Sequence, residues 1–243
     1  MEKERLDVEM VKRGLVKSRA VAVRLISEKQ VLVAGAPATK TNQQVTADAK
    51  IELLSTPKFV GRGGEKLAAA LSAFNVNPKD LIALDVGSST GGFTDCLLQA
   101  GAQKVYAVDV GTDQFDPTLK KDPRVVLMEQ TDIRNVTSLP DPIDLAVIDV
   151  SFISLTKVLP AASKLVKKSG AIIALIKPQF ETSPESKNRA GVIVDEKIRE
   201  QALQSVLTFV KEIGLHTVNT IPSPVAGGEG NFEYLVHFKN KSD

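Results

Sequence analysis

Charged side chains stand where four short apolar runs of this sequence end, and any chemistry is expected there. Such runs predict strands that are buried on both faces. The charged residues at or beside their ends are Asp85, Asp109, Asp149 and Lys177. Ligands bind beyond the carboxyl ends of strands in an open α/β sheet, and a charge buried there is costly unless it is paired. We therefore predict a polar ligand site at this edge, with a simple ion pair between Asp149 and Lys177 as the alternative.

The turn after the first apolar run is rich in glycine. Residues 84–93 read Leu-Asp-Val-Gly-Ser-Ser-Thr-Gly-Gly-Phe, and helical spacing from Phe93 to Ala100 ends at Gly101, which suits a C-cap. A strand, a glycine-rich turn and a helix form a cradle for nucleotide-like ligands, although these glycines do not fit G-x-G-x-x-G. A tight turn that binds nothing is the alternative.

The acid before this turn adds a more specific signal. Asp85 stands two residues before Gly87, and this arrangement resembles the first motif of S-adenosylmethionine-dependent methyltransferases. In those enzymes the backbone of the glycine turn lies against the methionine part of the cofactor. The resemblance implies S-adenosylmethionine as cofactor. The residues implied to bind it are Asp85, Gly87, Ser88, Gly91, Gly92 and Phe93.

Two more acids are candidates for contacts with the same cofactor. Asp109 ends the run Val105–Val108, a position where α/β folds commonly hold a pair of ribose hydroxyls. Asp132 follows the run Val125–Met128, and the resemblance to methyltransferases implies a hydrogen bond to an adenine amino group. The alternative for Asp132 is the N-cap of a short turn.

From Leu81 onward the hydrophobic pattern alternates between strands and helices, which predicts a doubly wound α/β fold. The expected strands cover 81–84, 105–108, 125–128, 144–150, 171–176, 215–221 and 232–239, and the expected helices cover 93–100, 154–168 and 195–213. The methyltransferase resemblance implies a Rossmann-like sheet that is mostly parallel, with an antiparallel last strand. Residues 183–189 form a polar, loop-like stretch.

Composition limits the class of protein. The chain has 243 residues, of which 43% are hydrophobic and 25% charged, as is ordinary for a soluble globular protein. Cys96 is the only cysteine, so no internal disulfide forms and a cytoplasmic location is expected. No stretch resembles a signal peptide or approaches the roughly 20 apolar residues that span a bilayer. His216 and His237 are far apart, so no metal site is expected.

The basic charge is concentrated in the N-terminal part. Residues 1–60 hold 11 Lys and Arg against 7 Asp and Glu, a net charge of +4, whereas the remainder carries −2. We expect a helix over 5–16, a second helix capped by Ser18 and running to Ile26, a hairpin from Val31 with Pro37 at an edge, and a strand over 49–54. A basic unit suits a polyanionic partner, with a solvated helix face as the alternative.

This N-terminal pattern resembles a small RNA-binding module, the one named after ribosomal protein S-four. The resemblance rests on Arg5-Leu6-Asp7, Ser18-Arg19-Ala20 and residues 31–35. In that family a basic helix pair lies on structured RNA, which implies recognition of phosphates and shape. The implied RNA-binding residues are Arg5, Arg13, Lys17, Arg19 and Arg24. The expected domains are an RNA-binding domain over 1–54, a linker over 55–61 and a methyltransferase domain over 62–243.

A last pattern joins charged residues that are far apart. Lys66 follows the glycines of residues 61–64, and Glu233 opens the last expected strand. Together with Asp149 and Lys177 at strand ends, these two residues give the sequence order lysine, aspartate, lysine, glutamate. This order resembles the Lys-Asp-Lys-Glu tetrad of FtsJ-like ribose methyltransferases. The tetrad so implied is Lys66, Asp149, Lys177 and Glu233. Short segments that flank these residues, among them Asp149–Leu155 and Lys177–Glu181, extend the resemblance to the TlyA family over nearly the whole chain. The alternative for Lys66 is a solvent-exposed lysine on a first helical turn.

This resemblance implies 2′-O-methylation of a cytidine in ribosomal RNA. A lysine can act as the base if it is neutral, which needs burial or a nearby cation. We expect Lys177 to be the base with Lys66 nearby, Lys66 and Asp149 to position the ribose, and Glu233 to lock the network. The expected partner is ribosomal RNA or a ribosomal subunit, the large one favoured, and no membrane. The pattern makes no prediction of the oligomeric state.

Two other functions compete with this one. A base methyltransferase on the same fold often carries an Asn/Asp-Pro-Pro-Tyr/Phe turn after the fourth strand, but residues 149–152 read Asp-Val-Ser-Phe. The other alternative is a non-catalytic RNA-binding or membrane-active protein, since the TlyA family often carries a hemolysin label. The full tetrad and the glycine turn argue against it.

Overall fold

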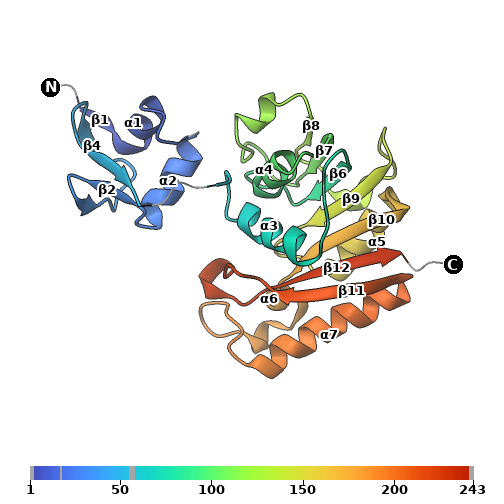
Figure 1. Ribbon diagram of the computed structural model, residues 1–243. Coiled ribbons are helices and arrows are strands. Elements are labelled where there is room, and N and C mark those ends of the chain that lie inside the picture. Colours follow the sequence, from blue (N-terminus) through green and yellow to red (C-terminus); the bar gives the residue numbers. More distant parts are fainter. Residues whose placement is uncertain (1–2, 17, 55–57, 241–243) are drawn as a thin grey trace.

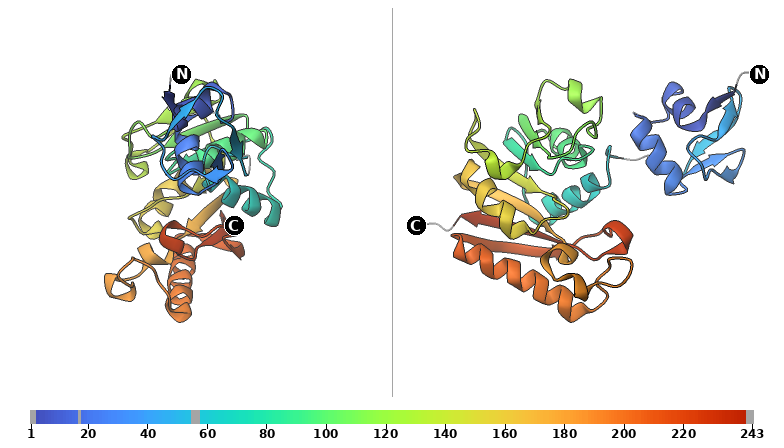
Figure 2. Two further views of the ribbon diagram at one scale, coloured as in Figure 1. Left: turned by 90° about the vertical axis from the view of Figure 1, so that its left-hand side faces the viewer. Right: turned by 180° about the vertical axis from the view of Figure 1, so that it is seen from behind.

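The computed structural model describes residues 3–16, 18–54 and 58–240, and the elements in them form a small N-terminal unit and a larger unit built on one sheet (Figure 1). The small unit contains β1 (Lys3–Arg5), α1 (Leu6–Lys12), α2 (Arg19–Ser27), β2 (Val31–Val33), β3 (Ala36–Pro37), β4 (Gln44–Thr46) and β5 (Ile51–Leu53). Strand β1 pairs with β4, and β2 lies between β3 and β5. Ser18 caps α2 as predicted, because its hydroxyl accepts a hydrogen bond from the amide of Val21. Seen from behind, the small unit lies to one side of the large one (Figure 2, right).

The large unit is built on a seven-stranded sheet in the order β11-β12-β10-β9-β6-β7-β8. Its strands are β6 (Ile82–Val86), β7 (Lys104–Val108), β8 (Val125–Met128), β9 (Ile143–Ile148), β10 (Val166–Ile176), β11 (Leu215–Pro222) and β12 (Tyr234–Asn240). The pairs among β6, β7, β8, β9 and β10 are parallel, and β12 is antiparallel to both β10 and β11. The predicted fold class, a mostly parallel sheet with an antiparallel last strand, is confirmed.

Helices cover both faces of this sheet. The α-helices are α3 (Gly63–Ala73), α4 (Gly92–Gln99), α5 (Leu155–Leu165), α6 (Pro178–Glu181) and α7 (Glu196–Glu212), and the short 3-10 turns are η1 (Leu119–Lys121), η2 (Ile133–Asn135), η3 (Pro184–Ser186) and η4 (Gly228–Gly230). Helices α3 and α4 pack together on one face, and α5 and α7 on the other. No helix among the described residues is long and apolar enough to cross a membrane.

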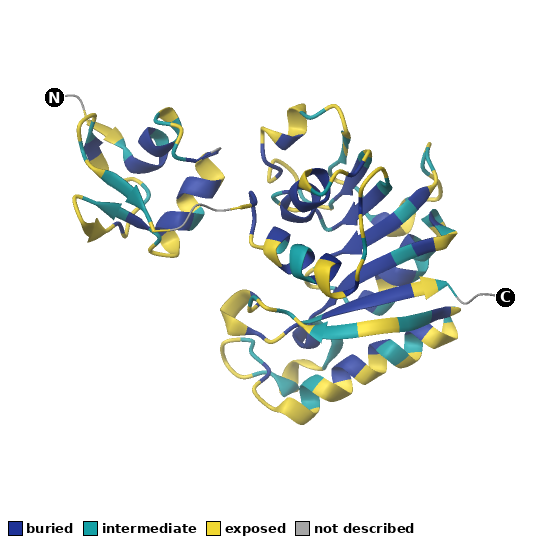
Figure 3. Cartoon of the chain, in the orientation of Figure 1, coloured by how far each residue is buried: buried dark blue, intermediate teal, exposed yellow. Residues whose placement is uncertain are grey.

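Alternation along the strands sends successive side chains into two different cores. On β6, Ala83 packs with the core that contains α3 and α4, whereas Leu84 packs with the core that contains α5 and α7. The same alternation holds for Leu175 and Ile176 on β10. Figure 3 shows the central strands buried over most of their length. Successive side chains of an extended backbone point to opposite faces, so a side chain just beyond a strand end continues the alternation and faces one of the two cores.

The structure corrects several predicted boundaries. Helix α5 ends at Leu165, not at Lys168, because β10 already begins at Val166, which pairs with Ile143 before a register shift to Ala171. Strand β12 begins at Tyr234 rather than Phe232. In the small unit, Arg5 lies in β1 and precedes the first helix, which is shorter than expected.

Candidate active site

Four charged side chains form two ion pairs at the carboxyl edge of the parallel strands. Nζ of Lys66 lies 2.5 Å from Oε2 of Glu233. Nζ of Lys177 lies 2.6 Å from Oδ1 of Asp149. Lys66, Lys177 and Glu233 are buried, and Asp149 is half-buried. The structure thus gives each lysine of the predicted tetrad a carboxylate partner, and Lys66 is not the exposed helix lysine that was the alternative.

The strand alternation explains why these side chains meet. Asp149 directly follows β9 and Lys177 directly follows β10, and both continue the alternation toward the face that carries α3. Glu233 precedes β12, whose Tyr234 is paired with Ile176, the residue before Lys177. Lys66, the fourth residue of α3, reaches the same place from the first turn of that helix.

The two pairs are joined by the start of α3. A β-carbon at Gly63 would lie 3.8 Å from Oδ2 of Asp149, so the first turn of this helix adjoins the second ion pair. Lys66, three residues further along, belongs to the first pair. The four charges therefore belong to one site bounded by α3, β9, β10 and β12.

The glycine turn lies beside this site. Gly87 has φ of 84°, and a β-carbon there would lie 2.4 Å from the carbonyl oxygen of Asp149, so the close approach requires glycine. Gly91, with φ of 93°, is the N-cap of α4. A cavity of about 500 Å³ opens next to the turn, and its lining includes Gly87, Ser89, Asp109, Asp132, Asp149 and Phe152. A smaller hollow of about 110 Å³ is lined in part by Gly63, Ser88, Gly92, Phe93 and Asp149.

Asp85 is fully buried, so its side chain cannot touch a ligand in the cavity. Its Oδ2 accepts a hydrogen bond of 2.6 Å from the Thr94 hydroxyl in the first turn of α4. Burial, partly opposed by this hydrogen bond, raises the pKa of Asp85 to about 7. Asp85 thus ties the end of β6 to the helix that follows the glycine turn. Sequence reasoning missed Thr94.

The other two predicted cofactor acids line the cavity. Asp109 accepts hydrogen bonds of 2.7 Å from the backbone amides of Ser89 and Gly111, which fixes the glycine turn to the end of β7. Asp132 caps η2, the role named as its alternative, and forms an ion pair with Arg134. The Arg134 hydrogen bond lowers the pKa of Asp132.

The loop after β9 contributes residues that sequence reasoning did not assign. Ser151 Oγ accepts a 2.9 Å hydrogen bond from Nζ of Lys177. Phe152 has φ of 63° and is 92% exposed, and it lines the cavity. Its ring lies 5.2 Å from the ring of Phe180 in α6. The sequence signal that could have identified Phe152 is its place as an aromatic residue three positions after Asp149, the charged residue at the strand end.

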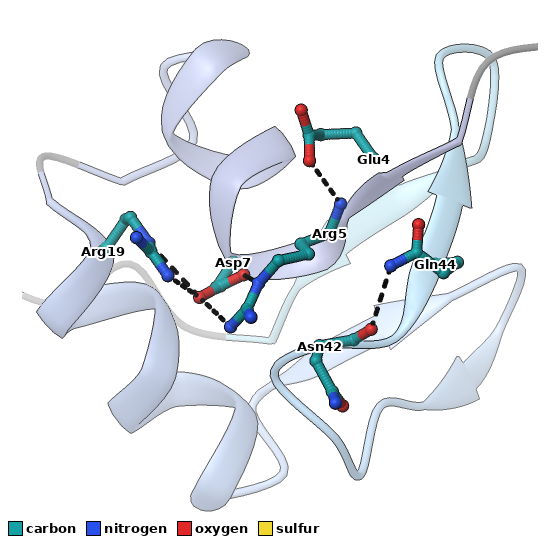
Figure 4. Close-up of polar contacts among 6 residues, drawn as sticks. All are labelled: Glu4, Arg5, Asp7, Arg19, Asn42 and Gln44. Carbon is teal, nitrogen blue, oxygen red and sulfur yellow. Dashed lines mark hydrogen bonds and ion pairs between the residues drawn. The ribbon is translucent and has the colours of Figure 1, made fainter.

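The basic residues of the small unit divide into two kinds. The buried carboxylate of Asp7 binds both Arg5 and Arg19, whose side chains are 43% and 59% exposed (Figure 4). These bonds, that of Arg5 foremost, lower the pKa of Asp7 to about 2. Arg13 instead turns inward, where it pairs with Glu9 and donates to three backbone carbonyls of residues 46–49.

Arg24 donates a 3.2 Å hydrogen bond to the carbonyl of Phe59, so it contacts the segment that leads into the large unit. That segment packs on α4, since Asp95 accepts from the amide of Val60 and Gln99 donates to the carbonyl of Lys58. The predicted RNA-binding residue Lys17 and part of the predicted linker, residues 55–57, lie outside the described residues.

Comparison with known families agrees with this architecture. The FtsJ-like methyltransferase family matches residues 59–240, and the S4 domain matches residues 4–51. The chain therefore belongs to the FtsJ-like methyltransferases, with an S4 domain at its N-terminal side.

Relatives extend over nearly the whole chain. The 16S/23S rRNA (cytidine-2′-O)-methyltransferase TlyA of Mycobacterium tuberculosis is 38% identical over 243 residues, which are 98% of this chain and 91% of that protein. The 23S rRNA (cytidine-2′-O)-methyltransferase TlyA of Campylobacter jejuni is 36% identical over 195 residues, covering 80% of this chain and 76% of that one.

Solved structures show the same fold. A Streptococcus thermophilus protein assigned to the hemolysins superposes with a TM-score of 0.77 at 38% identity, covering all of this chain and 90% of the other. A Listeria monocytogenes protein assigned to the S-adenosylmethionine-dependent methyltransferases shares the fold alone, with a TM-score of 0.55 at 14% identity, over 74% of this chain and 98% of that one.

Proposed function

We propose that this protein transfers a methyl group from S-adenosylmethionine to the 2′-hydroxyl of a cytidine in ribosomal RNA. The observation that carries the proposal is the pair of buried contacts Lys66–Glu233 and Lys177–Asp149 at one edge of the sheet, where Asp149 also lines the cavity at the glycine turn. The names of the TlyA relatives support the substrate and the reaction.

The cavity residues fit S-adenosylmethionine. The glycine turn would offer its backbone to the methionine part, Asp109 at the end of β7 would bind the ribose hydroxyls, and Asp132 would bind an adenine amino group; all three border the cavity. Ser88, Gly92 and Phe93 line the smaller hollow beside the turn, Gly91 is the N-cap of α4, and the buried carboxylate of Asp85 holds Thr94 of that helix. When bound, the cofactor supplies a sulfonium methyl group that needs only in-line placement of the acceptor oxygen.

The residues of this chain then have to place the ribose oxygen and remove its proton. Nζ of Lys177 would accept the proton of the 2′-hydroxyl as the ribose oxygen takes the methyl group that the cofactor would supply. Asp149, 2.6 Å away, stabilises the resulting ammonium. Lys66 is positioned by Glu233 to hold the ribose. Phe152 presents an exposed ring on which the target base can stack.

The S4 domain supplies RNA affinity. Arg5 and Arg19 are held by Asp7 with their guanidinium groups exposed, which suits contacts with phosphates. We assign Arg13 and Arg24 to the internal contacts that they make, and we keep Lys17 as an RNA contact on the sequence alone. Residues 1–54, 55–61 and 62–243 remain our proposed division into RNA-binding domain, linker and methyltransferase domain. Such a substrate places the reaction in the cytoplasm.

The proposed partner is a ribosomal subunit, the large one favoured, since the Campylobacter jejuni relative is named for 23S rRNA. The test incubates the protein with S-adenosylmethionine and each unmethylated subunit and maps ribose methylation by primer extension at limiting nucleotide. We expect a stop at a cytidine of the large-subunit RNA. A methylated base instead of a ribose, or failure to bind S-adenosylmethionine in a calorimetric titration, would refute the proposal.

A further inference from the structure

The loop between β9 and α5 needs contacts from residues outside the loop to fix its conformation. It carries Ser151, which contacts Lys177, and Phe152, which has φ of 63° and an almost fully exposed ring. A bulky residue with positive φ is a strained conformation, and it persists only where the surroundings fix it. Phe152 gains little from its own burial, so the fixing contacts have to come from neighbouring residues.

Glu181 provides such contacts at the far end of the loop. Its Oε2 accepts a hydrogen bond of 2.6 Å from the hydroxyl of Ser154, and its Oε1 accepts one of 2.8 Å from the backbone amide of Leu155. Leu155 is the first residue of α5, and Ser154 is its N-cap. A carboxylate at this helix N-terminus satisfies amide and hydroxyl donors that would otherwise have no partner.

The position of Glu181 in the sequence connects its contacts with Ser154 and Leu155 to the proposed base, Lys177. Glu181 ends α6, the four-residue helix that starts directly after Lys177. The loop is therefore held at its start by Lys177, through Asp149 and Ser151, and at its end by Glu181. The rings of Phe152 and Phe180 touch between these two points.

We propose that Glu181 is a positioning residue for methyl transfer, which fixes the loop 150–154 so that Ser151 and Phe152 keep their places beside Lys177. Glu181 does not touch the substrate in this account, and the inference rests on the proposed ribose methylation. What matters is the reach of its two oxygen atoms to Ser154 and Leu155, not its negative charge.

Three variants separate reach from charge. Glu181→Gln keeps the length and one acceptor for the amide of Leu155, Glu181→Asp keeps the charge but withdraws it by one methylene, and Glu181→Ala removes both. The matched control is Glu185→Ala, because Glu185 is exposed in η3 and, among the described residues, forms no hydrogen bond or ion pair with the loop 150–154. The readouts are kcat and KM for RNA, the affinity for S-adenosylmethionine, and hydrogen exchange at the amide of Leu155.

We expect Glu181→Asp and Glu181→Ala to lower kcat by about tenfold or more, because a displacement of about 1 Å is enough for such a loss. Cofactor affinity should stay within about threefold, and exchange at Leu155 should accelerate about tenfold. Glu181→Gln should retain both the protection of Leu155 and most of kcat, as should Glu185→Ala. If Glu181→Ala does not fold, the comparison of Glu181→Asp with Glu181→Gln still shows whether the reach of the side chain or its charge is required.

Full activity in Glu181→Asp would overturn the proposal, as would unchanged exchange at Leu155 or a Gln variant as impaired as the Asp variant. The exchange measurement does not depend on the reaction. A wild-type protein that methylates no RNA would therefore refute the proposed function, whereas the exchange result would still report whether Glu181 fastens the loop.

Discussion

Lys66 and Glu233 are 167 positions apart in the sequence, and their side chains meet in a buried ion pair with Nζ 2.5 Å from Oε2. The contact joins α3, which precedes the strands of the sheet in the sequence, to the residue before β12, the last strand in the sequence, which lies between β10 and β11 in the sheet. Because removal of one partner leaves a buried charge without compensation, this pair links the stability of the fold to the arrangement of the site.

We predict that stability and activity respond differently when this pair is replaced. Glu233→Ala should lower the free energy of unfolding by about 3–5 kcal/mol, because Lys66 remains buried and unpaired. The double variant Lys66→Met/Glu233→Leu should recover most of that stability and still transfer no methyl group. Urea unfolding and a methyl-transfer assay measure the two quantities.

The control for this experiment is the more exposed pair of Lys104 and Asp141, with side chains 36% and 31% exposed. Lys104→Ala should cost no more than about 1 kcal/mol. A double variant at positions 66 and 233 that methylates RNA at the wild-type rate would show that the pair is structural only.

Asp85 should make stability depend on pH. Its pKa of about 7 in the folded protein is above the value of an unfolded aspartate, so the folded state binds more protons between about pH 4 and 7. Its contribution to stability is therefore complete below pH 4 and is lost as the pH rises through 7, with a slope of at most about 1.4 kcal/mol per pH unit. Asp85→Asn should flatten the profile of unfolding free energy in this window. Identical profiles for the two proteins would contradict the assignment.

The arginines of the S4 domain should separate into RNA-binding and structural residues. Arg19→Ala should weaken RNA binding with little change in melting temperature. The slope of log K against log salt concentration should become shallower by about 1, the value for one lost phosphate contact. Arg13→Ala should lower the melting temperature, because it loses the Glu9 pair and three carbonyl contacts. Salt-dependent binding assays and thermal unfolding of both variants test the division, and equal effects of the two substitutions would reject it.

Phe152 should matter for turnover and not for stability. Its ring is 92% exposed, so Phe152→Ala removes little buried surface. Loss of a stacking surface for the target base costs about 1–3 kcal/mol, which corresponds to a decrease of roughly 5- to 150-fold in kcat/KM for RNA. Phe152→Tyr retains the ring and serves as the control. Unchanged kinetics in the alanine variant would exclude a stacking role.

Much of this fold follows from local patterns. Continuous apolar runs identified β6, β7 and β9, and Ser18 and Gly101 marked helix ends correctly. The strands β1 and β4 were missed, because their sequences, Lys-Glu-Arg and Gln-Val-Thr, lack the apolar run that marks a strand. The end of α5 was missed because a register shift extends β10 back to Val166, and only pairing with Ile143 shows this.

The site was less accessible to sequence reasoning than the fold. The family resemblance predicted that Lys66 and Glu233 belong to one site. Which lysine pairs with which carboxylate depends on the order of β9, β10 and β12 in the sheet. Arg13 was grouped with the RNA-binding arginines, because residue type does not show the carbonyls at 46–49 toward which it turns.

The central claim is that Lys177 accepts the proton of a ribose hydroxyl beside a bound S-adenosylmethionine. The most direct test measures two quantities in Lys177→Ala: the dissociation constant for S-adenosylmethionine by calorimetry and ribose methylation of ribosomal RNA by primer extension. We predict a dissociation constant within about threefold of the wild-type value together with loss of methylation by a factor of about 100 or more. Equal loss of cofactor affinity and activity, or methylation at the wild-type rate, would contradict the account.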